Sequence, residues 1–376
     1  MIGVRFSAVD TLFFRDGTPF PSDGTSQADV GGMFPPSPES VVGAVRAALA
    51  RYNGWNGQDR RWPADLNPVL GNGPEDLGSL SFEAPFLLQD DVPLIPVPRH
   101  VVGRIEGDRW HPRALLGPGS PVTCDLGDGV RLPQIVKNPW NIKPEELKAA
   151  SGWWLKLNAL GEVLRGGLPP EEALVAQKDL WRVERRIGLE RDANRRSAQE
   201  GRLYSARFVR LLWGVAIGAR VAGWPAGWSL PSGSLVPFGG EGRLAACEPW
   251  EAKSLDGLDM PVAEAFASGR LMVIALTPLV LDGAACRGEA PIPGLGDARL
   301  VSACLDRPLR IGGWNSLERS PSPVRSVLPA GSVLFCETLP ASVPDAIARR
   351  GVGLPRIGER TGYGYGVVAI GVWPNG

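Results

Sequence analysis

This sequence has few lysines and histidines, no paired-cysteine motif and no long apolar run. Each of these features limits the classes of protein to which the chain can belong. No two cysteines form a C-x-x-C pair, so neither a zinc knuckle nor a disulfide framework is indicated, and we expect buried reduced thiols. No apolar run approaches the ~20 residues of a membrane span, and charged residues interrupt the apolar N-terminus, so nothing there resembles a signal peptide. A cytoplasmic protein is expected. The cysteines stand at 124, 247, 286, 304 and 336.

The sequence also lacks the excess of positive charge that nucleic-acid-binding proteins usually show. It has 40 basic and 40 acidic residues, so its formal net charge is zero. Only six of the basic residues are lysine, and arginine is the side chain that pairs with phosphate through a planar fork and stacks on bases, although a GC-rich genome would produce the same bias. From Arg182 to Arg210, nine arginines stand against four acidic residues. This segment is a candidate phosphate-binding track.

Length and composition predict a folded protein of two domains. A chain of 376 residues is too long for one small core, and 44% hydrophobic with 21% charged residues is typical of globular proteins. Strand-like segments outnumber helical ones, and their order in the second half loosely repeats that of the first. This pattern predicts an α+β fold with antiparallel sheets, and we place the domain boundary between residues 214 and 215.

The first half begins with a strand and a well-marked helix. Residues 2–9 alternate between apolar and other residues, as a half-buried strand does. Ser37 can cap a helix that Pro38 opens, and apolar residues recur at helical spacing to residue 52. The loop 10–36 between them is rich in glycine and proline and is longer than a structural connection needs, so we suspect that it has a function.

Two inserts follow this helix. Residues 53–75 are rich in glycine, proline and tryptophan and predict an irregular segment. Proline interrupts the strand-like stretches between 79 and 102, which favours edge strands over central ones. The second insert covers about residues 104–180. We expect it to be rich in loops to about residue 140 and then to form two short amphipathic helices, at 144–160 and 169–175.

The arginine-rich segment at about 182–210 has strand-like runs on both sides of a polar excursion, which predicts a projecting hairpin, or thumb. In the second half, strands are expected at 271–281, 330–337 and 366–373, and a short helix at 343–350. A long passage rich in glycine and proline separates the first two of these strands.

The last segment carries the most informative motif. Gly362, Gly364 and Gly366 alternate with Tyr363 and Tyr365 just before the final strand. Glycines let a backbone approach phosphates closely, and tyrosines offer stacking faces to unpaired bases. Such a loop beside a terminal strand resembles the hallmark of the RAMP superfamily of CRISPR-associated RNA-binding proteins. The alternative is a tight turn with packed tyrosines.

Further strings spread along the chain resemble one branch of that superfamily, the third RAMP subunit of the type III-B (Cmr) effector complex. They are VDTLFFRDGTPF near the N-terminus, the arginine-rich RIGLERDANRRSAQEGRLYS, and the glycine-rich passages PFGGEGR and IGGWNSLERSPSPVRSVLPAGSVLF. Together the matches run from residue 9 to residue 370, and neither insert is covered by them.

The resemblance implies two tandem ferredoxin-like (RRM-related) domains, 1–214 and 215–376, with antiparallel sheets, glycine-rich loops and a projecting thumb hairpin. It also implies a non-catalytic subunit that needs no cofactor or metal and holds the 5′ repeat-derived tag of the crRNA. The implied protein partners are the large subunit with its polymerase-like palm and the first backbone RAMP subunit.

The expected contacts with RNA combine arginines for phosphate, glycines for close backbone approach and aromatic side chains for splayed bases. Purely structural roles remain open for several of them. The arginine-rich hairpin can be a solvated surface in which Glu190 and Asp192 pair with the arginines, and Arg46 can lie on an exposed helix face. Trp314, which we expect in a loop, can pack in the core. The full set is Arg15, Arg46, Arg185, Arg186, Arg191, Asn194, Arg195, Arg196, Gly239, Gly240, Arg243, Gly312, Gly313, Trp314, Arg319, Arg325, Gly362, Tyr363, Gly364 and Tyr365.

Two other classes of function are also considered. A RAMP-type endoribonuclease would use a histidine to assist attack by the 2′-hydroxyl, but His100 and His111 both lie outside every matched motif. An interaction scaffold would direct the arginines at acidic protein surfaces, and its apparent affinity for RNA would show a flat salt dependence.

Overall fold

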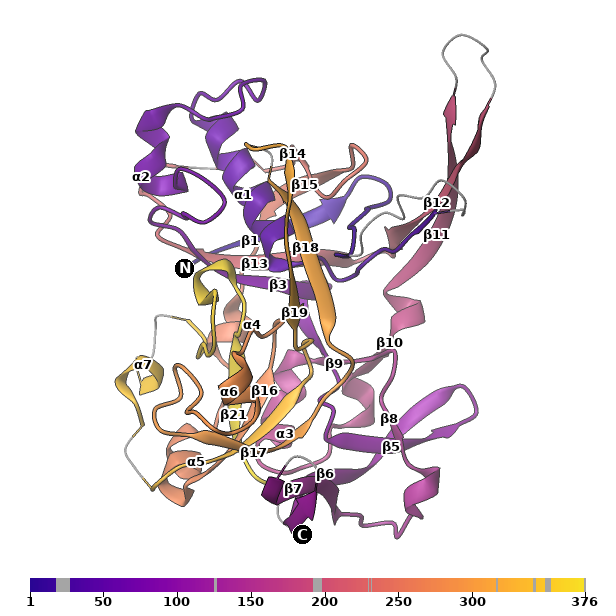
Figure 1. Ribbon diagram of the computed structural model, residues 1–376, viewed down its shortest axis with the longest axis vertical. Helices are drawn as coiled ribbons and strands as arrows, with labels where there is room; N and C mark the ends of the chain where they lie inside the picture. Colours follow the sequence, from indigo (N-terminus) through magenta and orange to yellow (C-terminus); the bar gives the residue numbers. More distant parts are fainter. Residues whose placement is uncertain are drawn as a thin grey trace.

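The computed structural model describes residues 1–17, 28–124, 127–191, 198–228, 230, 232–315, 317–340, 343–348 and 353–374, and Figure 1 shows how they are arranged. Short helices and mostly antiparallel strands make up this α+β protein, which confirms the predicted class. None of the helices in these ranges is long and apolar enough to cross a membrane.

An eight-stranded sheet forms the centre of the molecule. The strand β1 lies between β13 and β15, and β3 lies on the far side of β13. All four strands contribute buried residues to the core that the helix α1 shares. In spatial order the sheet contains β10 (Leu174–Ala176), β9 (Trp153–Lys156), β4 (Val92–Pro96), β3 (Ser81–Gln89), β13 (Val215–Ala222), β1 (Ile2–Ala8), β15 (Leu244–Pro249) and β14 (Ser234–Pro237).

The helix α1 (Pro38–Tyr52) covers one face of this sheet and begins where the sequence predicts. The Ser37 hydroxyl accepts a hydrogen bond from the Ser40 backbone N–H at 3.3 Å, which caps the first turn. Val41, Val45 and Leu49 are fully buried against the sheet. This apolar stripe fixes the helix over the sheet and leaves its N-terminus near the C-terminal glycine-rich loop.

A second, four-stranded sheet packs against the opposite face of the first. Phe86 and Leu88 from β3 share a core with Met272, Ile274 and Phe335 of this sheet. The helix α5 (Val262–Ser268) covers its outer face. The spatial order is β17 (Arg299–Cys304), β20 (Val333–Glu337), β16 (Arg270–Ala275) and β21 (Val368–Val372).

Further strands and short helices surround these two sheets. Two hairpins matter for the site, namely β11 (Trp181–Arg191) with β12 (Ala198–Leu211), which β2 (Ala28–Val30) joins in parallel, and β18 (Leu309–Asn315) with β19 (Ser320–Val327). In Figure 1 the far end of the β11–β12 hairpin extends away from the body of the molecule. The remaining elements are β5 (Val101–Glu106), β6 (Arg109–Cys124), β7 (Gly127–Lys137), β8 (Lys148–Ala149), α2 (Asn67–Leu70), α3 (Leu160–Leu164), α4 (Lys253–Asp256), α6 (Gly283–Cys286), α7 (Asp345–Ala348) and the 3-10 turns η1 (Ala64–Leu66), η2 (Pro144–Glu146), η3 (Leu157–Ala159), η4 (Glu171–Ala173), η5 (Gln177–Asp179) and η6 (Thr361–Tyr363).

The prediction of edge strands between residues 79 and 102 is wrong. The strand β3 pairs with β13 on one side and β4 on the other, so it lies inside the sheet. Its ladder with β13 has a register irregularity between Gly218 and Arg220, opposite the stretch that contains Pro85. A proline needs no ladder hydrogen bond at such a point, so β3 can be central in spite of it.

The second insert also differs from its prediction. Residues 109–124 and 127–137 form the long strands β6 and β7 instead of loops, and their prolines lie where the register shifts. Residues 144–160 contain two 3-10 turns and the strands β8 and β9 ahead of the short α3. Trp154 and Leu155 are buried because this segment pairs with β4. Residues 169–175 form a 3-10 turn and the strand β10 rather than a helix.

The sheet topology uses residues from both sides of the predicted boundary at 214. The strands β13, β14 and β15 follow that boundary and pair in the same sheet as β1 and β3. The boundary itself remains a prediction.

Candidate nucleic-acid interface

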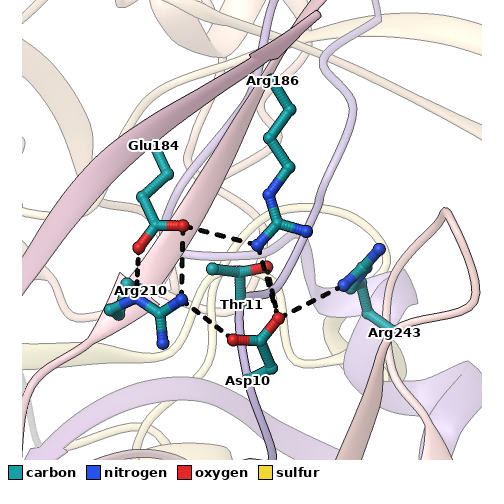
Figure 2. Close-up of polar contacts among 6 residues, drawn as sticks. All are labelled: Asp10, Thr11, Glu184, Arg186, Arg210 and Arg243. Atoms are coloured by element: carbon teal, nitrogen blue, oxygen red, sulfur yellow. Dashed lines mark hydrogen bonds and ion pairs between the residues drawn. The ribbon is translucent and has the colours of Figure 1, made fainter. Parts of the chain in front are cut away.

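Three arginines surround one aspartate at the root of the β11–β12 hairpin (Figure 2). Asp10 follows β1, and its carboxylate accepts hydrogen bonds from Arg210 at 2.9 Å and Arg186 at 3.3 Å, with Arg243 at 3.5 Å. Glu184 on β11 also pairs with Arg210 and lies 3.4 Å from Arg186. Two hairpin strands, the segment after β1 and the loop before β15 thus converge on one polar cluster.

The electrostatics of this cluster favour an anionic ligand. Hydrogen bonds from the Thr11 backbone N–H and from Arg210 lower the pKa of Asp10 to about 2, and Arg210 also lowers the pKa of Glu184. Both carboxylates are therefore ionised at neutral pH, yet three guanidinium groups exceed two carboxylates. The arginine side chains are between 25% and 41% exposed, so a ligand can reach them.

An aromatic side chain supports two of these arginines. The guanidinium groups of Arg186 and Arg243 lie over the Phe208 ring at 4.6 Å and 4.9 Å from its centroid. Phe208 is buried and packs against Phe13 at 5.1 Å between ring centroids. Cation–π contact and the carboxylates together hold the guanidinium groups in place before any ligand arrives.

The glycine-rich loop between β14 and β15 packs on the N-terminal segment. The Gly240 N–H donates to the Phe13 carbonyl at 2.8 Å. Gly239 has a φ of 86°, and a Cβ there would lie 2.3 Å from the same carbonyl oxygen. These glycines were expected to let the backbone approach a ligand closely. In the structure they approach the backbone of Phe13 instead, and this contact places Arg243 beside Asp10.

The C-terminal glycine-rich loop is packed in the core. Tyr365 is fully buried, its hydroxyl bonds the Glu39 carboxylate, and burial raises its pKa. Tyr363 is 8% exposed and donates its hydroxyl hydrogen to the Pro74 carbonyl. Gly364 lies against the backbone of Ala84 in β3. In this conformation the Tyr365 ring offers no face to a ligand. The loop forms a tight turn in which both tyrosines are packed against the rest of the protein.

The β18–β19 hairpin carries several predicted contacts to the surface. Trp314 lies on β18 and is 61% exposed, so the expectation of a loop position is wrong and its ring does not pack in the core. Gly312 and Gly313 precede it on the same strand, and Gly312 lies close to Gly17. Arg319 occupies the exposed turn with a φ of 53°, and Arg325 on β19 faces Glu75 at 3.9 Å.

The remaining predicted residues are dispersed. Arg46 is 6% exposed, because its guanidinium donates to the carbonyls of Gly73 and Asp76, so the exposed-face reading of this position is wrong. Arg15 is exposed and its backbone bridges to Gly32. Arg185 is exposed on β11, and Arg191 ends that strand. The predicted contacts Asn194, Arg195 and Arg196 lie outside the described residues.

Sequence reasoning missed four members of the cluster: Asp10, Glu184, Phe208 and Arg210. The hairpin register supplies the signal that could have found the three members on the hairpin, because Glu184 lies opposite Phe208 and Arg182 opposite Arg210. Every second residue of β11 and β12 shares one face, which brings Glu184, Arg186 and residues 208 and 210 together.

The two histidines occupy settings of different kinds. His100 is fully buried beside Phe335, and the loss of solvent lowers its pKa to about 3, so it is neutral and out of reach of a substrate. His111 bonds the Glu171 carboxylate at 2.7 Å, and Arg113 pairs with the same carboxylate. Within the described ranges, no three histidine, cysteine or acidic side chains are grouped as a metal site.

A family model described as CRISPR-associated protein (Cas_Cmr3) matches residues 4–373. The chain belongs to this family. No curated protein matches the sequence. Among solved structures, a chain of the cryo-EM structure of the Type III-B Cmr-beta bound to cognate target RNA is 15% identical, with 89% of this chain and 86% of that chain covered and a TM-score of 0.48. A chain of the Csm3-Csm4 subcomplex in the type III-A CRISPR-Cas interference complex is 12% identical, with 92% and 96% covered and a TM-score of 0.38.

Proposed function

We propose that this member of the Cas_Cmr3 family is a non-catalytic RNA-binding subunit of a type III-B effector complex and holds the 5′ repeat-derived tag of the crRNA. The observation that carries the proposal is the cluster of Arg186, Arg210 and Arg243 around Asp10, at the root of a hairpin that extends from the body. Family membership supports the same assignment.

The proposed architecture is a pair of ferredoxin-like domains with the β11–β12 hairpin as a thumb. Strand order supports it: in β15-β1-β13-β3 and again in β21-β16-β20-β17, the first and third strands of each set lie in the middle, with the fourth beside the first and the second beside the third. Such an order is what a β-α-β-β-α-β unit produces. A division by sheets would place the boundary after β15, later than the sequence suggests.

The chemistry of the cluster suits an RNA backbone. Guanidinium groups form paired hydrogen bonds with phosphate oxygens, and a cluster fixed by Asp10, Glu184 and Phe208 loses little conformational entropy on binding. Phosphates would enter on the open side of the guanidinium groups, and the carboxylates would keep the arginines oriented. The large polymerase-palm subunit and the first backbone subunit are the proposed protein partners.

The test is to express the chain with its genomic neighbours, purify the assembly through this chain, and sequence the small RNA that comes with it. We expect guides that share one 5′ repeat remnant, and we expect that remnant to be protected from nuclease by this chain. Substituting Arg186 and Arg210 with glutamine should reduce the protection. Guides whose 5′ ends remain protected in an assembly lacking this chain would contradict the proposal.

A further inference from the structure

A cavity of about 900 Å³ lies beside α4 and α5, near the N-terminal end of β1. Most of its lining comes from residues 250–263, which run from the end of β15 into α5, and the rest includes Arg220 on β13 and residues 353–355. None of the lining residues belongs to the cluster around Asp10 or to the predicted contacts with RNA. The proposed function therefore leaves this cavity without a role.

The base of the cavity is apolar. Trp250 and Leu255 are buried in the core that the two sheets share, and Leu258 and Met260 are partly buried against the same core. Val262 on α5 is partly buried against the core beneath that helix. Apolar surface that is only partly covered favours association, because the apolar side chains of a partner can remove it from water.

Contacts within the chain hold this apolar base in place. The Trp250 backbone N–H donates to the Gly3 carbonyl at 2.9 Å, and the Trp250 indole N–H donates to the Asp91 carbonyl at 3.1 Å. A Cβ at position 3 would lie 2.1 Å from the Trp250 carbonyl oxygen, so glycine is what allows β1 to approach this segment so closely. The cavity is therefore preformed, which lowers the entropic cost of binding.

The exposed charges around the cavity are mostly negative. The side chains of Glu251, Asp256 and Asp259 line it and are between 73% and 81% exposed. Among the described lining residues, Lys253 is the one exposed basic side chain, because Arg220 is almost completely buried. A cationic partner would relieve this local excess of negative charge.

The ion pairs that these carboxylates already make leave them able to accept further hydrogen bonds. Lys253 pairs with Glu251 at 2.8 Å, and Arg165 pairs with Asp259, both at the exposed surface. Exposed pairs of this kind contribute little to stability, and a carboxylate has lone pairs for several donors. An ammonium or guanidinium group of a partner can therefore share these carboxylates or replace their present partners.

The charge of the whole chain is divided between two regions. The formal net charge is zero, yet residues 182–210 carry nine arginines against four acidic residues, so the rest of the chain has an excess of five negative charges. Residues 248–264 account for four of these, with five acidic residues against Lys253. In Figure 1, α4 and α5 lie well away from the β11–β12 hairpin. RNA, a polyanion, would be repelled by the region around the cavity, whereas a cationic segment of a protein would be attracted.

We propose that this cavity is the docking site for a short segment of a partner protein in which apolar side chains alternate with lysine or arginine. The apolar side chains would pack on Leu258 and Met260, and the cationic ones would pair with Glu251 and Asp259 around them. The proposal does not depend on the grip on the crRNA tag, because it concerns other residues and a ligand of opposite charge.

The first test measures binding of a short fluorescein-labelled peptide of alternating leucine and lysine to the full-length chain, by fluorescence anisotropy. Replacing the lysines of the peptide with glutamine, or its leucines with serine, should weaken binding about tenfold or more. Asp259→Lys should weaken binding of the lysine peptide by a similar factor and strengthen binding of the same peptide with glutamate in place of lysine. Glu289→Lys is the matched control, because Glu289 is also exposed and paired with an arginine but does not line the cavity. It should bind both peptides like the unchanged protein.

The second test uses the assembly purified through this chain with its genomic neighbours. Carbodiimide coupling followed by mass spectrometry should join Glu251, Asp256 or Asp259 to a lysine of another protein, within a segment that also contains apolar residues, and Asp259→Lys should reduce these cross-links. Both results are required. Equal binding of the lysine peptide by Asp259→Lys and Glu289→Lys would overturn the proposal, as would the absence of such cross-links or their restriction to a second copy of this chain. Loss of crRNA from the Arg186 and Arg210 variants would leave both results unchanged, so the two proposals can fail separately.

Discussion

Glu83 on β3 and Arg220 on β13 form an ion pair that is almost completely removed from water, with side chains 0% and 3% exposed. The Arg220 Nε–H donates to a Glu83 carboxylate oxygen at 2.6 Å, and the other oxygen accepts the Leu354 backbone N–H at 2.7 Å. Arg356 lies 3.4 Å from that second oxygen. One buried carboxylate thus joins two neighbouring strands of the large sheet to the segment that leads into β21.

Replacing Glu83 with glutamine should strongly destabilise the protein. Arg220 would stay buried with only the exposed carboxylate of Asp256 left as a counter-charge, and breaking a buried pair in this way costs about 3–5 kcal/mol of unfolding free energy. Chemical denaturation followed by circular dichroism measures the loss. Glu289→Gln is the control, because Glu289 pairs with Arg287 at the exposed surface and its loss should leave the denaturation midpoint almost unchanged. Equal effects of the two substitutions would contradict the argument.

The hairpin arginines should determine the salt dependence of RNA binding. Each phosphate contact that is lost lowers the slope of log K against log salt by about one, so Arg186→Gln and Arg210→Gln should each flatten the slope by that amount and weaken binding at low salt. Fluorescence anisotropy of a labelled single-stranded RNA at several salt concentrations gives the slope. Arg287→Gln, outside the cluster, should leave it unchanged. A flat slope for the unchanged protein would favour an interaction scaffold over an RNA-binding subunit.

His100 should reduce stability below neutral pH. Its folded-state pKa of about 3 lies below the ordinary 6.5, so the unfolded chain binds a proton that the folded chain does not, and stability falls as the pH drops below about 6.5. Neither ring nitrogen has a hydrogen-bond partner among the described residues. His100→Leu should therefore raise the unfolding free energy by about 1–3 kcal/mol at neutral pH. Thermal unfolding of the unchanged protein and of the variant should show a difference in unfolding free energy that grows toward pH 5, by at most about 1.4 kcal/mol per pH unit. A difference independent of pH would contradict this assignment.

The cysteines should divide into two classes of reactivity. Burial raises the pKa values of Cys247 and Cys304 to about 12 and that of Cys336 also upward, so their thiols stay protonated and covered. Cys286 is exposed and Cys124 partly so. Iodoacetamide at about pH 8, followed by mass spectrometry, should modify only Cys286 and Cys124 until denaturant is added. Labelling of Cys336 in the folded protein would refute the burial that underlies this prediction.

Two glycines of the C-terminal loop should respond differently to substitution by alanine. Gly364 has a φ of 98°, and a Cβ there would lie 2.7 Å from the Ala84 carbonyl oxygen, so Gly364→Ala should cost about 1–3 kcal/mol. At Gly362 the nearest atom would be a Leu77 methyl carbon at 3.4 Å, an ordinary contact. Gly362→Ala should therefore change the unfolding free energy little. Comparing denaturation curves of the two variants tests whether the loop serves packing, and a similar small effect at both positions would argue against it.

The sequence predicted those elements whose signals are local. Alternation identified β1, and the hydrogen-bonding cap at Ser37 with the apolar stripe that follows it located the start of α1. The prolines in β3 and β6 led to wrong predictions of an edge strand and of loops. Both segments are paired strands because the ladder register is irregular near these prolines, where no hydrogen bond from proline is needed. The irregularity beside β3 depends on β13, more than a hundred positions away, and leaves no mark in the segment itself.

The location of the site on the arginine-rich hairpin was predictable from the sequence, but most of the residues that form it were not. The arginine-rich composition of 182–210 pointed to the hairpin, but the selection of Arg186 and Arg210 by Asp10 depends on how the segment after β1 bridges to β12 at Leu12 and Val209. The C-terminal loop shows the opposite case. Its glycines and tyrosines match a ligand-binding pattern, yet the hydroxyl of Tyr365 is taken up by Glu39 on α1, which only the tertiary structure brings there.

The strand β12 leads through Leu212, Trp213 and Gly214 into β13, which lies between β1 and β3 in the large sheet. Leu12 and Val209 exchange backbone hydrogen bonds of 2.8 Å at the base of the hairpin, and the Gly214 carbonyl accepts the Asp90 N–H at 2.8 Å. The hairpin is thus covalently continuous, at its base, with a central strand of the large sheet. A pulling force on its outer part should meet resistance from the whole sheet, so single-molecule extension should find the hairpin's rupture coupled to that of β13.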